Sequence, residues 1–344
     1  MSTHVHILGI DLGKNWFHLV GIDTHGKVIL RKKLKREKVL PFIADLPACI
    51  VSMESCPGSQ YLGRRCDAAG HAVRIIPAQF VKPYVKSNKN DFNDAQAIAE
   101  AASRATMRYV PLKNPEQLEL QAIHRVRQRF ITERTATVNQ MRALLLENGI
   151  TIATGRALFA RRLPAILEDA DNGLSIRLRA LLDTLRHRWR TLDSEIQEMT
   201  DLLNEHAKHS ELCVRASTVP GVGPIVSTAL VAAVGNGRAF GRGRDMAAWL
   251  GLVPRQYSTG GKSTLGAISK RGNRYLRQLF IQGAQALYIH MKRDQSALGQ
   301  WLRALEARSH RHVAVVALAN KIVRICWKVL TSGQAYQLFP GRSG

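Results

Sequence analysis

The first hundred residues alternate between strand-like and helix-like segments, and this alternation constrains the fold more than any other feature. Residues 5–34 contain three strand-like stretches, VHILGID, NWFHLVGID and KVILRKKL, with short segments suited to turns between them. A fourth apolar stretch, ACIVSME, is followed by a segment with a proline start and a glycine stop, which is typical of a helix, and then by VRIIP. A β-meander followed by βα units predicts an α/β sheet domain over residues 1–108.

Four carboxylates fall at the ends of these segments. Asp11 lies in GIDLGK, near the end of an apolar strand, where a carboxylate is costly unless it is paired or binds a metal. Glu54 ends another apolar strand, whereas Asp91 and Asp94 begin a helix and share one of its faces. Acids at these positions are the pattern of an RNase H-like domain. Taken alone, Asp91 or Asp94 is more often an ordinary helix N-cap, and Asp11 is also compatible with a turn cap.

Carboxylates from two strand ends and one helix start can converge on a cation. Hard oxygen ligands of this kind suit Mg²⁺ or Mn²⁺. Two such ions about 4 Å apart activate the attacking oxygen and stabilise the leaving oxygen in phosphodiester displacement. A single ion with fewer ligands is an open alternative. The sequence therefore predicts a metal-dependent centre for phosphodiester chemistry at Asp11, Glu54, Asp91 and Asp94.

Long helices are expected in the middle of the chain, over residues 109–210. Strand signals stop beyond Pro115, and apolar residues recur at helical spacing up to a glycine stop at Gly149. A second helix carries apolar residues in steps of four and three, the a/d pattern of a coiled coil. These residues are Leu178, Leu182, Leu185, Trp189, Leu192, Ile196, Met199 and Leu203. Spacing leaves open whether the seam closes within one chain or between chains, and we expect a role in assembly of a dimer or tetramer.

The chain is strongly and unevenly basic. Its 344 residues include 50 Lys and Arg against 26 Asp and Glu, a formal charge of +24. From residue 237 onward there are 18 Lys and Arg against three acids, a net charge of +15. A positive charge of this size attracts polyanions and is typical of proteins that bind nucleic acids. A basic protein that is merely soluble, or one that meets anionic lipid, is the alternative that this uneven placement disfavours.

The cysteines and the hydropathy of the sequence indicate in which cellular compartment the protein works. The five cysteines contain no C-x-x-C pair and no matching histidine spacing, which argues against a disulfide framework and a structural zinc site. No uninterrupted apolar run approaches the roughly 20 residues needed to span a bilayer. We therefore expect a soluble cytoplasmic protein that does not bind membranes.

The last region, residues 211–344, is expected to be mainly α-helical. Helices are predicted around residues 244–250, 271–292 and 311–330. Before them, the turn that contains Gly221 and Gly223 precedes an apolar helix, which matches a helix-hairpin-helix motif. In that motif the turn exposes backbone N–H groups to a DNA phosphate. A tight turn between two packed helices is the alternative.

The segments together resemble a known family, the DEDD transposases of the insertion-sequence 110 type, whose N-terminal domain is similar to the Holliday-junction resolvase RuvC. GIDLGK, SMES and KNDFNDAQAIAE match the family's acid tetrad in order and context. PGVGPIVSTAL and FGRGRDMAAWLGLVPRQYSTGGKSTLGAISKRGNRYLRQLF match its C-terminal half. The wording GGK…LG…ISKRGNRYLR is similar to the subgroup named after insertion sequence 1111. The resemblance covers nearly the whole chain.

The resemblance implies a DNA transposase, or site-specific recombinase, with a second chemical group. The family's members are thought to join a C-terminal serine covalently to DNA, and the matching segment here is PRQYSTGGK. Ser258 is the candidate, with Thr259 and Ser263 as competitors, because the spacing differs by one residue from the other subgroup. Arg255 and Lys262 are placed to stabilise developing negative charge. Without the resemblance this segment would be read as a flexible loop.

The resemblance also implies partners. A structured non-coding RNA of the element, a bridge RNA, would pair with donor and target DNA and supply the sequence specificity. The protein would then work in the cytoplasm on the bacterial nucleoid. Basic residues near Ser258 are candidates for holding phosphates, because positions i, i+1, i+4 and i+7 share much of one helical face. They are Lys270, Arg271, Arg274 and Arg277.

Three rival interpretations remain. A structure-specific nuclease resembling a junction resolvase would use the acid tetrad and water, without a covalent intermediate. An ATP-binding protein of the actin and sugar-kinase type also has a strand like GIDLGK, but the sequence after Glu54 does not clearly provide the second glycine-rich phosphate loop. A basic architectural or RNA-binding protein would have no need of an intact tetrad.

Overall fold

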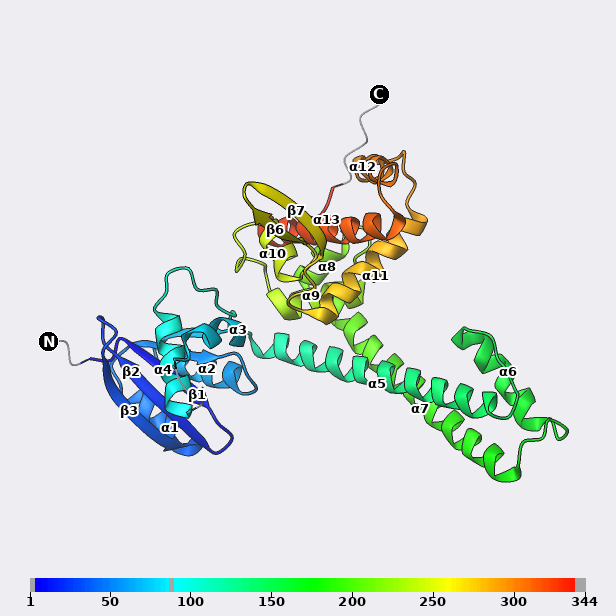
Figure 1. Cartoon of the computed structure of the whole chain (residues 1–344), viewed down its shortest axis with the longest axis horizontal. Coiled ribbons are helices and arrows are strands. Elements are labelled where there is room, and N and C mark those ends of the chain that lie inside the picture. The colour runs from blue at the N-terminus through cyan, green and yellow to red at the C-terminus, as the bar shows by residue number, and fades with distance from the viewer. Residues whose placement is uncertain (1–3, 87–89, 338–344) are drawn as a thin grey trace. The chain divides into compact units, whose positions relative to one another are not determined.

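The computed structural model describes residues 4–86 and 90–337, and its contacts divide the chain into two units, residues 1–114 and 115–344 (Figure 1). The first unit is a mixed α/β sheet domain and the second is mostly helical, which confirms the predicted fold class. The further boundary predicted at residue 210 stays a prediction. No helix in the described ranges is long and apolar enough to cross a membrane.

A five-stranded sheet forms the first unit, with the strand order β3-β2-β1-β4-β5. The strands are β1 (Ile7–Leu12), β2 (Trp16–Ile22), β3 (Val28–Lys35), β4 (Ile50–Glu54) and β5 (Ala72–Ile76). The first three pair antiparallel as a meander, and β4 and β5 run parallel to β1. This is the strand pattern that the sequence predicts, with β1 at the centre.

The two faces of the sheet carry different helices. One face buries the alternate apolar residues of β1, Leu8 and Ile10, beneath α1 (Arg36–Ala44) and α2 (Ser59–Ala68). The other face lies under α4 (Asp91–Ala102). The short helices α3 (Ala78–Val81) and η1 (Lys82–Tyr84) follow β5. Because side chains alternate along a strand, the odd-numbered residues of β1 all face α4.

The second unit begins with a helical hairpin. Helix α5 (Pro115–Leu146) packs along α7 (Ile176–His209), and α6 (Arg156–Glu168) joins them. Helices α5 and α7 run antiparallel, because Arg127 of α5 donates a hydrogen bond of 2.7 Å to Thr200 of α7, whereas Arg134, seven residues later, pairs with Asp193 at 2.8 Å. All eight residues of the predicted heptad seam are buried or half-buried. The seam therefore closes within the chain.

The remaining helices enclose the largest core of the chain. They are α8 (Glu211–Ser217), α9 (Pro224–Val234), α10 (Gly243–Trp249), α11 (Arg274–His290), α12 (Ala297–Glu306) and α13 (Arg311–Ser332). Between α10 and α11, strands β6 (Pro254–Thr259) and β7 (Lys262–Ile268) form an exposed hairpin. The sequence predicts α10, α11 and α13, but neither the hairpin nor α12.

A buried histidine links three helices of this unit. Nδ1 of His124 on α5 lies 2.9 Å from the Tyr275 hydroxyl on α11, and Nε2 lies 3.0 Å from the Thr228 hydroxyl on α9. Burial lowers the pKa of His124 to about 4, with a smaller effect from the positive charge of Arg127. The imidazole is therefore neutral at physiological pH and joins the helices through hydrogen bonds.

His124 should make the stability of the second unit depend on pH. Between pH 6.5, the ordinary pKa, and about 4, the unfolded chain binds a proton at His124 and the folded chain does not. Stability is therefore lost as pH falls through this window, by about 3 kcal/mol in total. We expect His124→Gln, which does not titrate, to lack this loss. Urea unfolding of both proteins at pH 7 and pH 4.5 measures the difference, and parallel losses would contradict the assignment.

Candidate metal centre and serine hairpin

Gly9 sets how closely α4 approaches the sheet. A Cβ atom at Gly9 would overlap the carbonyl oxygen of Ala95 and lie 2.7 Å from the backbone nitrogen of Ala99. The backbone of α4 therefore rests directly on β1. Because Asp91, Ala95 and Ala99 follow one another at intervals of four, they share a helical face. The contact at Gly9 thus brings Asp91 beside Asp11, which lies two residues further along β1.

The four predicted acids gather at this end of the sheet. One ligand atom each from Asp11, Asp91 and His18 lie within 4.8 Å of one another. Burial raises the pKa of Asp11, and the negative charges of Asp91, Asp94 and Glu54 raise it further, while His18 lowers it. Burial and the charge of Asp94 also raise the pKa of Glu54. Glu54 and Asp94 therefore lie within electrostatic reach of the same cluster.

The N-cap alternative for the two helical aspartates does not hold. The N-cap of α4 is Asn90, whose side-chain oxygen accepts a hydrogen bond of 3.0 Å from the backbone nitrogen of Phe92. Asp91 and Asp94 occupy the first turn, so neither carboxylate is used to cap the helix. Carboxylates near a helix N-terminus are also favoured by the helix dipole, which offsets part of their mutual repulsion.

His18 belongs to the cluster, although sequence reasoning missed it. It lies on β2 directly opposite Asp11, and its Nδ1 is 3.4 Å from a carboxylate oxygen of Asp91. The ring also packs edge-on against Phe92, with centroids 4.8 Å apart. Its signal in the sequence is a polar residue within WFHLVGI, where the register of the β1–β2 hairpin decides its partner. His18 can orient Asp91 or serve as a nitrogen ligand beside it.

The composition of the cluster fits a divalent cation. Burial is the main cause of the raised pKa of Asp11, and repulsion from Asp91, Asp94 and Glu54 adds to it. A divalent cation would offset that repulsion, and oxygen-rich ligand sets suit Mg²⁺ or Mn²⁺. Asp11 and Asp91 offer the closest oxygens, and Glu54 and Asp94 stand within electrostatic range.

Ser258 lies in the second unit, on strand β6 of the exposed hairpin. Its Oγ accepts a hydrogen bond of 3.0 Å from the side-chain amide of Gln256. The register pairs Ser258 with Ser263 and pairs Thr259 with Lys262. Side chains on directly opposed residues share a face, so Ser258 and Ser263 lie on one face and Thr259 on the other. A glycine turn, in which Gly260 and Gly261 have φ of +56° and +77°, connects the strands.

The hairpin register separates Ser258 from the cations expected to assist it. Lys262 pairs with Thr259, and Arg255 is three residues from Ser258 along β6, so both belong to the opposite face. The face that carries Ser258 holds Gln256, Ser263 and Leu265. The loop alternative is also wrong, since PRQYST forms strand β6.

The single basic helical face expected near this hairpin is not formed. Helix α11 begins at Arg274, after Lys270 and Gly272 adopt φ of +55° and +75°, so Lys270 and Arg271 precede the helix. Arg277 is buried, and its guanidinium donates hydrogen bonds of 2.9 and 2.8 Å to the carbonyl oxygens of Leu250 and Arg271. Its guanidinium therefore joins the end of α10 to the segment that precedes α11. Lys270, Arg271 and Arg274 are exposed.

The predicted helix-hairpin-helix segment has the expected order of helix, turn and helix, formed by α8, Gly221–Gly223 and α9. Gly221 has a φ of +83°, and a Cβ there would lie 3.0 Å from the carbonyl oxygen of Gly283 on α11. Gly221 is therefore required for packing of the turn against α11. Gly223 is exposed and has open space around it, so it remains the candidate for a phosphate contact.

Family models match both units of the chain. Residues 8–149 match a model of DEDD transposases of the IS110 type, and residues 213–300 match a model described as the transposase IS116/IS110/IS902 family. The first match contains the acidic cluster and the second contains the serine hairpin.

Similar proteins cover nearly the same length. A probable family 20 transposase of Pseudomonas aeruginosa is 44% identical over 96% of this chain and 98% of its own. A transposase for insertion sequence element IS1328 of Yersinia enterocolitica is 42% identical, over 97% of this chain and 99% of its own. A transposase for insertion sequence element IS1111A of Coxiella burnetii is 44% identical, over 97% of this chain and 92% of its own.

Removing the charge of Asp11 should stabilise the metal-free protein. Asp11→Asn keeps the shape and removes the repulsion from three neighbouring carboxylates, so we expect a gain of roughly 0.5–2 kcal/mol in the free energy of unfolding. Mg²⁺ should raise the melting temperature of the wild type and not that of Asp11→Asn, which calorimetry measures. Asp45→Asn, a change at an exposed carboxylate on the same unit, should alter neither quantity. Equal responses of wild type and Asp11→Asn to Mg²⁺ would refute a metal site there.

A side chain at Gly9 should displace α4 and separate the acids. Gly9→Val inserts atoms where the α4 backbone lies, and we expect a loss of about 1–3 kcal/mol in stability together with loss of Mg²⁺ binding. Ile7→Val, on the same face of β1, is the matched control and should cost about 0.5–1.5 kcal/mol while keeping the metal response. Titration calorimetry with Mg²⁺ on folded protein decides between them. Retained binding in Gly9→Val would show that the close contact is not what positions Asp91.

Proposed function

The chain belongs to the IS116/IS110/IS902 family of transposases, and from this we propose that it cuts and rejoins DNA strands with an acidic metal centre and a serine. Membership of this family makes the chain an insertion-sequence transposase, an enzyme that cuts DNA. The observation that carries the proposal is the gathering of Asp11, Asp91 and His18 within 4.8 Å, beside Glu54 and Asp94.

Asp11, Glu54, Asp91 and Asp94 are proposed to hold Mg²⁺ or Mn²⁺. When bound, such an ion supplies Lewis-acid activation for displacement at a phosphodiester. The chain's own residues prepare the site in three ways. Gly9 lets α4 come close, Asn90 fixes the first turn of that helix, and His18 restrains Asp91 from the neighbouring strand.

Ser258 is proposed as the nucleophile. Its Oγ would form a bond to the phosphorus, the bond from phosphorus to the leaving sugar oxygen would break, and the hydroxyl proton would pass to a base. On its own hairpin face Ser258 has Gln256 and Ser263 as polar neighbours, and neither is a base at neutral pH. The base must come from another element.

A second candidate function follows from the completeness of the acidic cluster. Its four carboxylates and His18 all belong to the first unit, so they could direct water at a phosphodiester without Ser258. The protein would then act as a structure-specific nuclease resembling a Holliday-junction resolvase. The two functions differ in whether a covalent protein–DNA intermediate forms.

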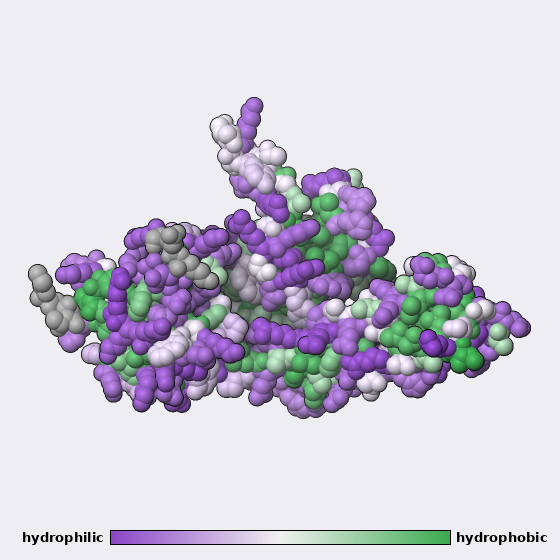
Figure 2. Space-filling model, turned by 60° about the horizontal axis from the view of Figure 1, so that its bottom comes forward, coloured by the Kyte–Doolittle hydropathy of each residue, from purple (hydrophilic) through white to green (hydrophobic). Residues whose placement is uncertain are grey.

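Guidance by a non-coding RNA and assembly into a homo-oligomer complete the proposal. The formal charge of +24 suits a second polyanion beside DNA. Because the heptad seam closes within the chain, an oligomer must use other surfaces. Leu146, Ile176 and Leu181 are exposed at the end of the hairpin near α6, where Figure 2 shows apolar surface. Exposed apolar side chains of this kind are typical of association sites.

Trapping of the covalent intermediate tests the serine. With Mg²⁺ and a donor DNA, the wild type should give a protein–DNA adduct on a denaturing gel, and Ser258→Ala should lose both the adduct and at least about 10³-fold in recombination. Ser263→Ala, on the same hairpin face, is the matched control and should keep both. Asp11→Asn should bind DNA and form no adduct. Cleavage by Ser258→Ala at the wild-type rate would contradict the serine mechanism and favour the function of a structure-specific nuclease.

A further inference from the structure

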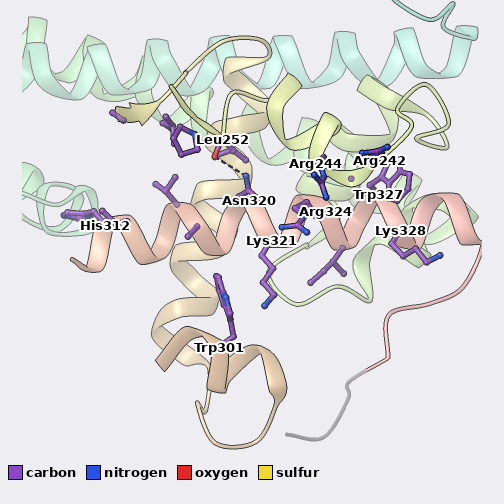
Figure 3. A pocket seen from close by; sticks show the side chains of 18 of the residues that line it. Arg242, Arg244, Leu252, Trp301, His312, Asn320, Lys321, Arg324, Trp327 and Lys328 are labelled. Carbon is purple, nitrogen blue, oxygen red and sulfur yellow. Dashed lines mark hydrogen bonds between the residues drawn. The ribbon is translucent and has the colours of Figure 1, made fainter. Parts of the chain in front are cut away.

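We propose that a cavity of about 1030 Å³ in the second unit binds an unpaired DNA strand (Figure 3). The cavity lies between α13, the start of α10, Trp301 of α12 and the base of the β6–β7 hairpin. Its volume is at the upper end of the range of roughly 300–1,000 Å³ that is usual for small-molecule pockets. None of the residues that line it belongs to the acidic cluster or to the basic segment next to Ser258 described above.

One part of the cavity is cationic. Lys321, Arg324 and Lys328 follow one another at steps of three and four, so they lie along one face of α13. Arg242 and Arg244 face them from the start of α10, as Figure 3 shows. Within residues 4–86 and 90–337, the ion pairs within 4 Å all use other cations.

Among the described residues, no acidic side chain lines the cavity beside these cations. Asp245, the acid next to Arg244 in sequence, is half-buried and does not line the cavity. Burial lowers the pKa of Lys321, and the neighbouring charge of Arg324 lowers it further. Crowded cations without acids favour an anionic ligand, and a row along a helix suits the repeated charge of a phosphate backbone.

Another part of the cavity is apolar and aromatic. Val313 and Val316 extend the same face of α13 toward its N-terminus, and Trp301 lies across from Lys321. The Lys321 ammonium is 3.9 Å from the centre of the Trp301 ring. Trp327 is held in place because its indole N–H donates to the carbonyl oxygen of Phe240 at 3.0 Å. The cavity therefore offers fixed aromatic surface beside a row of cations.

This combination selects a single strand over a duplex. A duplex presents phosphates and hides its base faces, so a convex row of exposed cations suffices to bind it. An unpaired strand also presents base faces, which stack on aromatic side chains while cations follow the backbone. The hollow shape and the two indoles favour an unpaired strand, because a duplex has no exposed base faces to stack on them.

The position of the cavity favours DNA as the strand that it binds, because it adjoins the hairpin that carries Ser258. Pro254 and Gly266, at the base of the hairpin that carries Ser258, line its edge. By the rise of a strand, Ser258 is about 13 Å along the hairpin from Pro254. A DNA strand separated from its complement at the cut site would have a place to lie beside the hairpin. The inference rests on the proposed function for its DNA substrate, but not on the catalytic roles of Asp11 and Ser258.

Binding of labelled oligonucleotides tests the cavity directly. In full-length Asp11→Asn, which cannot complete the proposed reaction, we expect Arg324→Glu/Lys328→Glu to weaken single-stranded DNA binding at least tenfold. Loss of two phosphate contacts should also lower the slope of log affinity against log salt by about 1.4. Trp301→Ala should weaken binding about 5- to 100-fold, with partial recovery in Trp301→Phe. Fluorescence anisotropy measures all of these.

The matched control is Arg190→Glu, an exposed arginine of α7 outside the cavity, which should change single-strand affinity less than twofold. Since Arg324 and Lys328 are exposed, their reversal should leave the circular dichroism spectrum and melting temperature unchanged. Unchanged single-strand affinity in that folded double variant would overturn the inference. So would an equal loss for duplex and single strand, or tighter binding of the matching RNA than of the DNA. Because binding needs no catalysis, an inactive Ser258 variant that still binds would separate failure of the mechanism from failure of the cavity.

Discussion

The contact between the backbone of α4 and β1 at Gly9 is the constraint on which the acidic centre depends. A sheet and a helix usually pack through layers of side chains, which would keep the first turn of α4 away from the strand ends. With no side chain at Gly9 and only methyl groups at Ala95 and Ala99, the two backbones meet. Asp91 then comes beside Asp11, and the central strand of the sheet acquires a carboxylate pair at its end.

This arrangement has an electrostatic cost, and the cost indicates function. Burial and three like charges raise the pKa of Asp11, so the folded chain keeps a carboxylate that works against its own stability. A fold selected for stability alone would place an amide or an apolar residue there. Strain of this kind is typical of sites whose ligand compensates for it. A divalent cation is the ligand that the geometry and the oxygen donors favour.

Much of this could be predicted from the sequence, because local patterns determine it. Alternation of apolar residues gives the strands, and the steps of four and three give the seam of α7. Which residues become neighbours across strands, or bond to distant parts of the chain, could not be predicted in the same way. His18 enters the acidic cluster only through the register of the β1–β2 hairpin. Arg277 looks like a surface cation, yet it is buried and donates to the carbonyl oxygens of Leu250, at the end of α10, and Arg271, just before α11. The faces of the Ser258 hairpin depend on a register that starts from its glycine turn.

The division of chemical groups between the two units has a regulatory consequence. The carboxylates and the serine belong to separate structural units, and the serine stands on an exposed hairpin with an amide as its hydrogen-bond partner. A hydroxyl in that setting has an ordinary reactivity and no base on its own face. On the proposed serine mechanism, neither unit alone holds all the groups that strand transfer needs. If the serine obtains a base only when nucleic acid is bound, cutting is restricted to the assembled complex, and a free transposase leaves the chromosome intact.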